Sequence, residues 1–312
     1  MLRRDIIKSM EELLKKCMLC PRKCGADRLH GKTGVCGANA RIKVARAALH
    51  FWEEPCISGT MGSGTVFFSY CPLHCVYCQN QPISSGAAGM EIETGRLTEI
   101  FLELQEQGAH NINLVTPTQY TPQILRALKN AKEQGLSVPI IYNCGGYEDV
   151  HTLAMLRGIV DVYLTDFKYM DAGIAKRYSG VPDYFCRAKE ALAEMAEQAG
   201  KAVFDEDGLM QNGVVVRVLL LPGCLADAQN IVRYVYETYG DDIYLSLMSQ
   251  YTPMEENARM PRELRRTVTR QEYDALVDFA IDLGVENGFV QDGEAAQESF
   301  IPPFDLTGVQ KN

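Results

Sequence analysis

The sequence has no long, uninterrupted apolar run. Its longest apolar stretch, VVVRVLLL, is broken by Arg217, so we expect no membrane-spanning segment. The first 17 residues carry Asp5, Glu11 and Glu12 and lack the apolar centre of a signal peptide, so we interpret them as an amphipathic helix. Repeats and low-complexity tracts are also missing. With 312 residues, 46% of them hydrophobic and 23% charged, the chain suits one large α/β domain with a small appendage.

Positive charge is scarce outside the N-terminal part. Residues 1–50 carry twelve Lys and Arg against four Asp and Glu, whereas the rest of the chain carries 19 against 36. An acidic main body argues against sequence-independent binding of nucleic acid, which depends on Lys and Arg against phosphates. The basic N-terminal part either docks on an acidic partner or packs on the acidic remainder of its own chain.

Cysteine is abundant, with eleven residues. Disulfide-rich secreted proteins are usually short chains with an export signal, and this chain shows neither feature. The number is odd, and seven of the cysteines fall in two tight groups. We therefore expect a reducing cytoplasm and metal-bound thiolates.

From residue 65 onward, apolar strands alternate with amphipathic helices. Thr94 and Thr121 are expected as helix caps, and a capping box of Thr269 and Glu272 opens the last helix. The tail from about residue 286 reads as polar and irregular. We expect strands at 65–70, 111–115, 138–143, 160–167, 213–221 and 242–248, and helices at 94–107, 122–134, 148–157, 172–199 with a break at SGVPD, 227–239 and 270–283.

Six strand–helix units predict a parallel sheet with right-handed crossovers, and they are too few for an eightfold barrel. We expect a partial (β/α)6 barrel over residues 51–290, an N-terminal cysteine-rich metal-binding lobe over 1–50 and a tail over 291–312. In such barrels the chemistry lies at the C-terminal ends of the strands.

The segment SYCPLHCVYCQN follows the first of these strands and spaces Cys71, Cys75 and Cys78 as C-x3-C-x2-C. Three thiolates on a four-iron cluster leave one iron with an open position, as catalytic metal sites require. The alternative is a zinc knuckle with a fourth ligand from elsewhere. His74 is the nearest candidate for that ligand, but it adjoins Cys75.

CPLHCVYCQN, with Tyr77 in its aromatic position, resembles the signature of radical SAM enzymes. CMLCPRKCGADRLHGKTGVCG, EEPCISGTMGSGTVFFS, NINLVTPTQY, YNCGGYE, YLTDFKYMD and VVVRVLLLPG extend the resemblance over nearly the whole chain. Together these segments resemble pyruvate formate-lyase activating enzyme-like proteins. The resemblance implies a 4Fe–4S cluster, S-adenosylmethionine, and an electron donor such as flavodoxin or ferredoxin. It further implies reductive cleavage to methionine and a 5′-deoxyadenosyl radical that abstracts hydrogen.

The resemblance also assigns roles to residues. Cys71, Cys75 and Cys78 would hold the cluster, and Tyr77 would flank the adenine. Thr116, Pro117 and Thr118 would contact the methionyl amine, and Asn143 would bond ribose or carboxylate; as ordinary alternatives, these positions are strand-end turns.

Lys168 is the favoured partner for the carboxylate of S-adenosylmethionine. Asp166 precedes it by two residues on the same face of the strand, and Arg217 is expected to point the same way. The alternative is a structural ion pair that closes the barrel. Tyr70 and Val218 depart from the family pattern, which often has glycine and histidine there, and the eight-cysteine insert of some glycyl-radical activases is missing.

A second group, Cys17, Cys20, Cys24 and Cys36, has the spacing C-x2-C-x3-C-x11-C. Four thiolates saturate a metal, and a segment this short needs such a staple to fold. Zinc, a single iron and a second cluster all remain open, with a slight preference for structural zinc or iron.

The remaining cysteines and two histidines are weaker candidates. Cys144 and Cys224 follow strand ends, and we favour buried packing over substrate contact for both. Cys56, His50 and His30 are also expected to pack.

The favoured function is activation of a glycyl-radical-type protein partner. The alternatives are radical modification of a small molecule or peptide and, far behind, a non-catalytic metal-binding module or an RNA modifier. Neither nucleic acid nor membrane is expected as a partner.

Overall fold

The computed structural model describes residues 11–253, 260–290 and 301–311. Its centre is a ten-stranded sheet in which β10, β9, β8, β6, β5, β4, β2, β1 and β3 are successive neighbours, while β7 (Val203–Phe204) pairs only with β8. The path consists of β1 (Ile42–His50), β2 (Ser63–Phe68), β3 (Met90–Ile92), β4 (Ile112–Val115), β5 (Ile140–Cys144), β6 (Val162–Asp166), β8 (Met210–Leu219), β9 (Tyr244–Met248) and β10 (Gly288–Val290).

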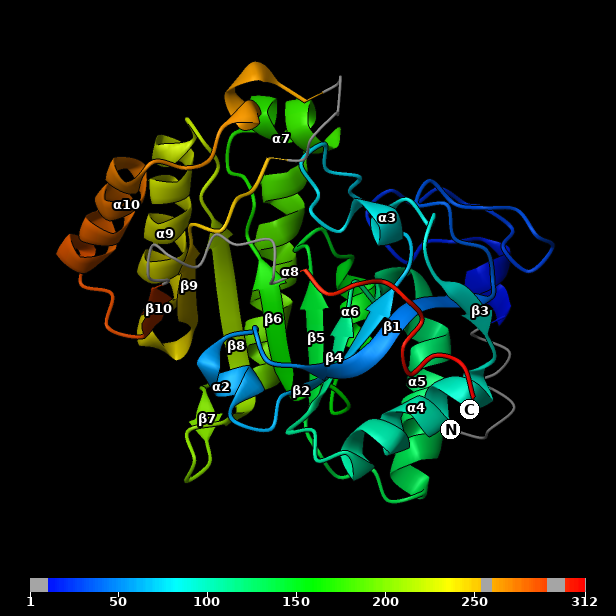
Figure 1. Cartoon of the computed structure of the whole chain (residues 1–312). Helices are drawn as coiled ribbons and strands as arrows, with labels where there is room; N and C mark the ends of the chain where they lie inside the picture. The colour runs from blue at the N-terminus through cyan, green and yellow to red at the C-terminus, as the bar shows by residue number, and fades with distance from the viewer. Residues whose placement is uncertain (1–10, 254–259, 291–300, 312) are drawn as a thin grey trace.

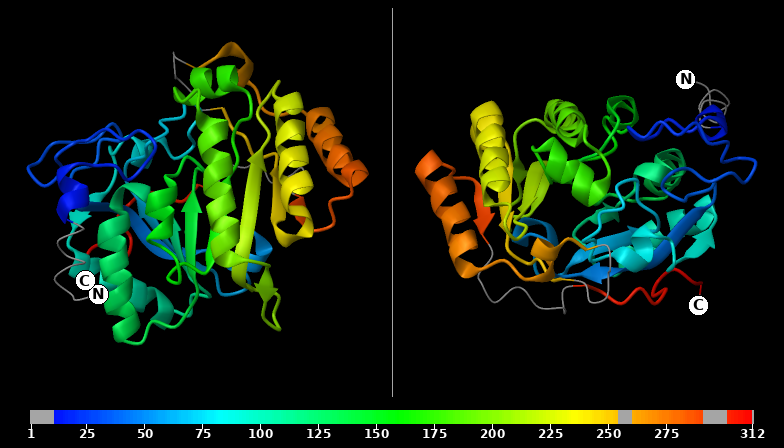
Figure 2. Two further views of the ribbon diagram at one scale, coloured as in Figure 1. Left: turned by 180° about the vertical axis from the view of Figure 1, so that it is seen from behind. Right: turned by 90° about the horizontal axis from the view of Figure 1, so that it is seen from above.

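Along the path from β2 through β4, β5, β6, β8 and β9 to β10, neighbouring strands pair in parallel. The pairs β1–β2, β1–β3 and β7–β8 are antiparallel. The larger helices lie along one face of the curved sheet, as the view from above shows (Figures 1 and 2). The helices are α2 (Pro55–Ser58), α3 (Gln81–Ser84), α4 (Thr94–Glu106), α5 (Thr121–Glu133), α6 (Val150–Ala154), α7 (Ala172–Ser179), α8 (Tyr184–Ala199), α9 (Leu225–Tyr239) and α10 (Arg270–Leu283). The predicted α/β class with six strand–helix units in an open, mostly parallel sheet is confirmed.

The helices form where apolar residues recur at helical spacing. In α4, the buried face consists of Leu97, Ile100, Phe101 and Leu104, as predicted from the pattern. The capping box at the start of α10 is present, because the Thr269 hydroxyl accepts from the Glu272 backbone and the Glu272 carboxylate accepts from Thr269 in return.

Two predicted caps are wrong. Thr94 and Thr121 are the first helical residues of α4 and α5, and the N-cap positions belong to Glu93 and Tyr120, neither of which makes a side-chain cap bond. A cap residue must precede the helix, and here both helices already include the threonine that was expected to cap them.

Both ends of the chain contribute more to the sheet than expected. Ile42–His50, assigned from sequence to the N-terminal lobe, forms β1 and pairs with β2. Gly288–Val290 is a strand instead of irregular tail, and residues 301–311 lie along β1, where the Ala47 amide donates to the Thr307 carbonyl at 2.8 Å. Of the expected N-terminal helix, residues 11–15 are helical and the earlier ones lie outside the described residues.

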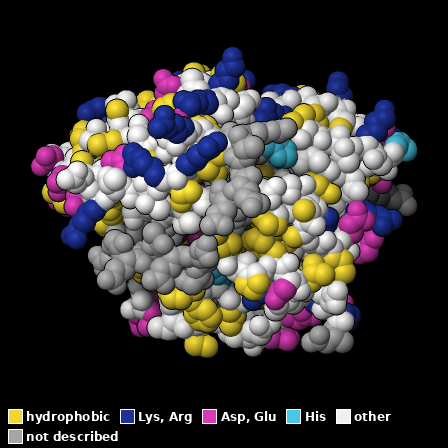
Figure 3. Space-filling model, turned by 45° about the horizontal axis from the view of Figure 1, so that its top comes forward, with side chains coloured by type: hydrophobic (Ala, Val, Ile, Leu, Met, Phe, Trp, Pro, Cys, Tyr) yellow, Lys and Arg dark blue, Asp and Glu magenta, His cyan; other side chains and the backbone are white. Residues whose placement is uncertain are grey.

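No helix among the described residues is long and apolar enough to cross a membrane. The surface of one face carries gathered Lys and Arg side chains in its upper part (Figure 3). The segment Arg262–Arg265 is a short 3-10 turn on which Arg262, Arg265 and the following Arg266 are three closely spaced cations.

Candidate functional site

The three cysteines of the C-x3-C-x2-C motif lie in the loop between β2 and α3. Tyr70 and His74 adopt left-handed backbone angles, with φ of 73° and 51°, so the loop turns sharply before Cys71 and before Cys75. Glycine adopts φ above zero without strain, which explains why glycine suits position 70. Here the Tyr70 ring is accommodated by Gly86, because a Cβ on Gly86 would lie 2.0 Å from Tyr70 Cε1. We will call Cys71, Cys75 and Cys78 the triplet.

The triplet thiols are neighbours within one largely apolar loop. Burial, followed by the adjacent thiols of Cys75 and Cys78, raises the pKa of Cys71 well above its ordinary value. Cys75 Sγ accepts a hydrogen bond from Ser179 Oγ at 3.0 Å. His74 Nε2 lies 3.1 Å from the Val35 carbonyl, so His74 does not complete a zinc knuckle with the triplet.

Within the described residues, no three His, Cys, Asp or Glu side chains converge closely enough to hold a single metal ion. This holds for the triplet and for the N-terminal cysteines. All eleven cysteines lie in the described part of the chain, and all are free thiols.

A cavity of about 220 Å³ adjoins the triplet at the C-terminal ends of the strands. Its wall combines thiols, aromatic rings, neutral amides and charged groups, a mixture that suits a small ligand with both apolar and polar parts. Its wall includes Cys75, Cys78, Tyr77, Asn143, Lys168 and Arg217.

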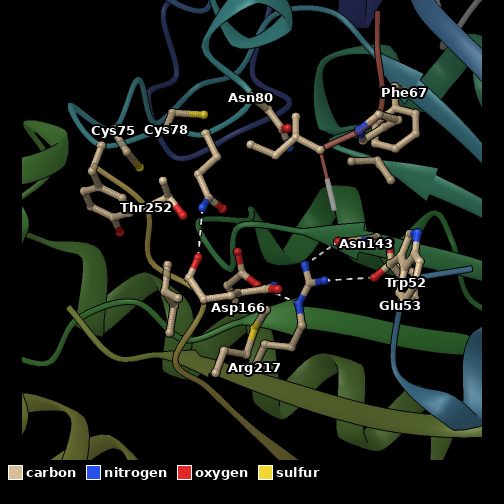
Figure 4. Close-up of a pocket in the computed structure, with 18 of the residues that line it drawn as sticks. Trp52, Glu53, Phe67, Cys75, Cys78, Asn80, Asn143, Asp166, Arg217 and Thr252 are labelled. Atoms are coloured by element: carbon tan, nitrogen blue, oxygen red, sulfur yellow. Dashed lines mark hydrogen bonds and ion pairs between the residues drawn. The ribbon is translucent and has the colours of Figure 1, made fainter. Parts of the chain in front are cut away.

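Arg217 is the centre of a buried polar network on one side of this cavity (Figure 4). Its Nε donates to Asp166 Oδ1 at 2.8 Å, its Nη1 to Glu53 Oε2 at 3.1 Å and its Nη2 to Asn143 Oδ1 at 2.7 Å. Burial alone would raise the pKa of Asp166, but Arg217 and Lys168 outweigh it and lower that pKa below its ordinary value. The guanidinium therefore holds three side chains from three different segments in fixed positions.

Lys168 occupies the cavity end of the same network. Its Nζ lies 2.6 Å from Asp166 Oδ2, and its side chain is 15% exposed. Burial opposes its charge, yet Asp166 and the Cys75 thiol together raise the pKa of Lys168 above its ordinary value. Lys168 and Arg217 thus both contact Asp166, and the predicted contact of Lys168 with the carboxylate of S-adenosylmethionine stays a prediction.

Glu53 is a cavity residue that the sequence analysis missed. It follows β1 in a connection without a strand or helix pattern, and its Oε1 accepts from the amides of Asn113 and Asn143, both at 3.2 Å. Burial raises the pKa of Glu53, and Arg217 opposes that rise. The one available signal was negative charge next to an aromatic residue in a segment, FWEEPC, that bridges two predicted elements.

The other predicted contacts divide into two sets. Tyr77 lines the cavity with a buried hydroxyl that accepts a hydrogen bond from the Tyr169 hydroxyl at 2.7 Å, and Asn143 lines it as well. Thr116, Pro117 and Thr118 are not among the lining residues. Instead, Thr118 Oγ1 donates to buried Glu148 at 2.8 Å, on a different side of the loop. The structure therefore does not bring these three residues to the cavity.

The N-terminal cysteines, which we will call the quartet, line a separate small cavity of about 10 Å³. All four, Cys17, Cys20, Cys24 and Cys36, face it together with Pro72 of the triplet loop and Thr118. Gly34 leaves room for two of the thiols, because a Cβ there would lie 3.2 Å from Cys24 Sγ and 3.4 Å from Cys36 Sγ. The four cysteines of the quartet therefore share one cavity, although their thiols do not converge closely enough in this structure to surround a metal ion.

The remaining cysteines behave as packing residues, whereas His30 is exposed, contrary to the expectation, and His50 lines the main cavity. Cys144 bonds Thr165 at 3.4 Å and Cys224 bonds Tyr178 at 3.9 Å, and neither lines the main cavity. His30 pairs with Asp27 at 2.7 Å, and Cys56 is buried in an apolar cluster. His50 does line the cavity, and burial lowers its pKa to about 4, so it is neutral near pH 7.

Comparison with known proteins finds distant likenesses. No protein-family model matches the chain. An uncharacterised protein of Methanocaldococcus jannaschii is 27% identical over 280 residues, which cover 86% of this chain and 75% of that protein.

Among solved structures, Streptococcus suis SuiB bound to S-adenosylmethionine overlaps 71% of this chain at 12% identity with a TM-score of 0.47. Methylornithine synthase, PylB, overlaps 92% of this chain and 80% of its own at 16% identity with a TM-score of 0.42. The chain covers about half of the SuiB chain, 48%. These overlaps are partial, and they do not bear on the reaction of this chain.

Proposed function

We propose that the chain is a radical SAM enzyme whose triplet binds a 4Fe–4S cluster and whose main cavity binds S-adenosylmethionine. One observation carries the proposal: the C-x3-C-x2-C thiols stand at the C-terminal end of a parallel strand, and two of them line a cavity that also contains Lys168. The resemblance of the sequence, and not the geometry, extends this proposal to an oxidoreductase of the pyruvate formate-lyase activating enzyme-like kind.

The residues present fit the two cofactors. Three thiols are the soft donor set that iron–sulfur clusters take, and a fourth protein ligand is not needed. When bound, such a cluster supplies the electron for reductive cleavage of S-adenosylmethionine, as the resemblance implies.

The residues of the chain bind and orient S-adenosylmethionine and shield it from water. Lys168, held by Asp166, offers a fixed cation to the carboxylate of S-adenosylmethionine, and Tyr77 offers a ring whose hydroxyl is already committed to Tyr169. Asn143 is held by Arg217 and Glu53, so its amide cannot turn freely. Preorganised polar groups of this kind bind a charged ligand without first paying for their own ordering.

The nature of the substrate is a separate question. Activation of a glycyl-radical-type protein partner rests on the resemblance alone. Modification of a small molecule or peptide is favoured by the lining of the cavity, where neutral Gln79, Asn80, Gln250 and Thr252 suit a small polar substrate. A face with gathered Lys and Arg supports docking of an electron donor with an acidic surface, for which the resemblance names flavodoxin or ferredoxin (Figure 3).

Anaerobic reconstitution with iron and sulfide tests the proposal. We expect a visible chromophore that dithionite bleaches, and release of 5′-deoxyadenosine and methionine from S-adenosylmethionine. A reconstituted, folded protein that binds no iron, or that leaves S-adenosylmethionine intact under dithionite, would remove the assignment.

The substrate class is then decided with deuterated cell fractions. Deuterium in 5′-deoxyadenosine from a protein fraction, with a glycyl-type doublet in the electron paramagnetic resonance spectrum, indicates a protein partner. Deuterium from the small-molecule fraction alone indicates the other class.

We further propose that the quartet holds a second metal. Its support here is that four thiols face one small cavity. The chemistry of the four-thiolate set leaves zinc, iron and a second cluster as candidates.

A further inference from the structure

Arg28 is a fully buried cation next to the quartet. It is 1% exposed, and its guanidinium is charged at any physiological pH. Its Nη1 donates to the Gln119 carbonyl at 2.6 Å, while its Nε and Nη2 donate to the Asn39 carbonyl at 3.1 and 2.6 Å. The Tyr120 ring lies beneath it, 5.7 Å from Arg28 Cζ to the ring centroid.

These partners satisfy the hydrogen bonds of Arg28 but not its charge. Carbonyl groups and an aromatic ring are neutral, and among the described residues no Asp or Glu forms an ion pair with Arg28. Glu148 is a buried carboxyl on the Thr118 side of the quartet cavity. It accepts hydrogen bonds from Thr118 and Tyr142 and none from Arg28. A charge removed from water without an opposite charge is strongly unfavourable, so an anion is expected nearby.

The remaining contact of Arg28 is a sulfur atom. Nη1 lies 3.7 Å from Cys17 Sγ, and Cys17 shares its small cavity with the other three cysteines of the quartet. Four neutral thiols would leave Arg28 without a counter-charge. Metal-bound thiolates carry more negative charge than a divalent ion carries positive charge, so the centre as a whole is an anion.

We propose that the quartet binds a thiophilic metal centre, zinc or iron–sulfur, as thiolates, and that Arg28 is the buried counter-charge of that centre. This proposal does not rest on the S-adenosylmethionine chemistry, because neither Arg28 nor the quartet belongs to the main cavity.

The same centre fastens the loop of the triplet. Arg28 holds the Gln119 backbone, and the Gln119 side-chain amide donates to the carbonyls of Ser69 and Tyr70, the two residues before Cys71, at 3.0 and 3.1 Å. Arg22, between two quartet cysteines, donates to the Pro72 carbonyl at 3.0 Å. Loss of the quartet metal is therefore expected to loosen the triplet loop, and Arg28 acts on that loop as a positioning residue.

The test measures metal in the full chain with the triplet removed. A Cys71→Ala, Cys75→Ala, Cys78→Ala protein is purified from zinc-supplemented cells, and separately reconstituted anaerobically with iron and sulfide. Metal content is determined by mass spectrometry, and iron–sulfur absorption is recorded. We expect one metal centre per chain from one of the two sources, lost when Cys17→Ser and Cys36→Ser are added.

The counter-charge is tested in the same background. Arg28→Met is expected to speed metal release to a chelator about tenfold, the scale of one lost charge-assisted contact, while Arg28→Lys restores part of the retention. Arg41→Met is the matched control, because Arg41 is an exposed arginine on the same segment, and its release rate should stay at that of the parent.

Two results would overturn the two parts of the proposal. A cooperatively melting triplet-free protein without metal from either source overturns the site. Metal that Arg28→Met retains as firmly as the parent overturns the counter-charge. If Arg28→Met does not fold, Arg28→Gln carries the decision, because it keeps donors for the carbonyl groups without a charge, and metal release as slow as in the parent would contradict the counter-charge. Failure of S-adenosylmethionine cleavage in the wild type leaves all of these readings unaffected.

Discussion

Two buried arginines stand next to the two cysteine groups, and their surroundings differ. Arg217 pairs with the carboxylates of Asp166 and Glu53, at 2.8 and 3.1 Å, beside a cavity of about 220 Å³. Within the part of the chain that the structure describes, the polar and ring contacts of Arg28 are carbonyls, the Tyr120 ring and Cys17 Sγ, beside a cavity of about 10 Å³. Charge in the first region is balanced by protein carboxylates, so the thiols there remain available to a ligand.

The contrast distinguishes a site that can bind and release a small molecule from a site that stabilises the fold. Around Arg217, the protein balances its own charges, and the adjoining space is large enough to admit a small molecule. Around Arg28, the thiols themselves are the nearest candidates for the anion, and the space admits little more than a single small group. Substitutions in the first region are therefore expected to change binding and catalysis, and those in the second to change folding and metal retention.

The largest expected effect comes from Cys75. Replacing Cys75 by Ala removes one of three thiols from the proposed cluster, so release of 5′-deoxyadenosine should fall below detection after anaerobic reconstitution. Quartet metal should be retained, because no quartet residue is touched.

Cys186→Ala is the control for this experiment, since Cys186 is an exposed cysteine of α8. It should cleave S-adenosylmethionine at the wild-type rate. Full cleavage by the Cys75 variant would contradict the role of the triplet.

Arg217 has the next largest effect, and it acts on stability. Arg217→Met leaves Asp166 with Lys168 alone and Glu53 with two neutral amides, and these charged groups are only partly exposed. Breaking a buried ion pair by removing one partner costs about 3–5 kcal/mol of unfolding free energy. Urea unfolding measures the loss, with Arg126→Met on the exposed face of α5 as the control, expected to change stability by less than about 0.5 kcal/mol. A loss as small as that of the control would mean that Arg217 is not the centre of the network.

The elements of this network show how far the sequence could lead. Asp166, Lys168 and Arg217 were predictable, because charged residues at the ends of buried parallel strands must meet at one edge of the sheet. Glu53 was not, because its position depends on the path of an irregular connection after β1. The strand β1 itself was missed because Lys43 and Arg46 interrupt its apolar residues without the regular alternation of a strand. A register shift between Val44 and Arg46 breaks that alternation, and its partner β3 is distant in sequence.

The quartet and the segment from Thr116 to Thr118 differ in how well the sequence predicted their positions. Cysteine spacing predicted a four-thiolate metal site for the quartet; the four cysteines line one cavity, and the metal stays a prediction. The placement of Thr118 was missed because a left-handed Thr116, with φ of 55°, turns the chain toward Glu148. Such a turn depends on the tertiary bond from the Thr116 amide to the Asn143 carbonyl at 2.8 Å, which no local pattern encodes.

Lys168 tests whether the first region binds S-adenosylmethionine. Lys168→Met keeps most of the stem and removes the charge, so affinity should fall on the order of 10- to 100-fold, matching a charged hydrogen bond of about 1.5–3 kcal/mol. Isothermal titration of the reconstituted proteins measures it. Because Arg217 still pairs with Asp166, the melting temperature should change less than in Arg217→Met. Unchanged affinity with a lowered melting temperature would make Lys168 a structural partner of Asp166 only.

The smallest expected effect lies at Gly34, in the second region. A Cβ there would lie 3.2 Å from Cys24 Sγ and 3.4 Å from Cys36 Sγ, which is tighter than ordinary contact, and Gly34 is not among the residues with positive φ. Gly34→Ala therefore adds one methyl group against two thiols without backbone strain. Thiols held by a metal cannot move aside, so the methyl group should cost about 1 kcal/mol or slightly more and speed metal release. Free thiols can rotate away, and then Ala should be neutral or slightly stabilising, because it reduces the freedom of the unfolded chain.

Gly95→Ala is the matched control, since a Cβ at Gly95 meets nothing within 4 Å and Ala favours the first turn of α4. Thermal melting with and without chelator separates the cases: a Gly34→Ala penalty that disappears when metal is stripped identifies fixed thiolates, whereas no penalty in either state would mean that the quartet thiols are unrestrained.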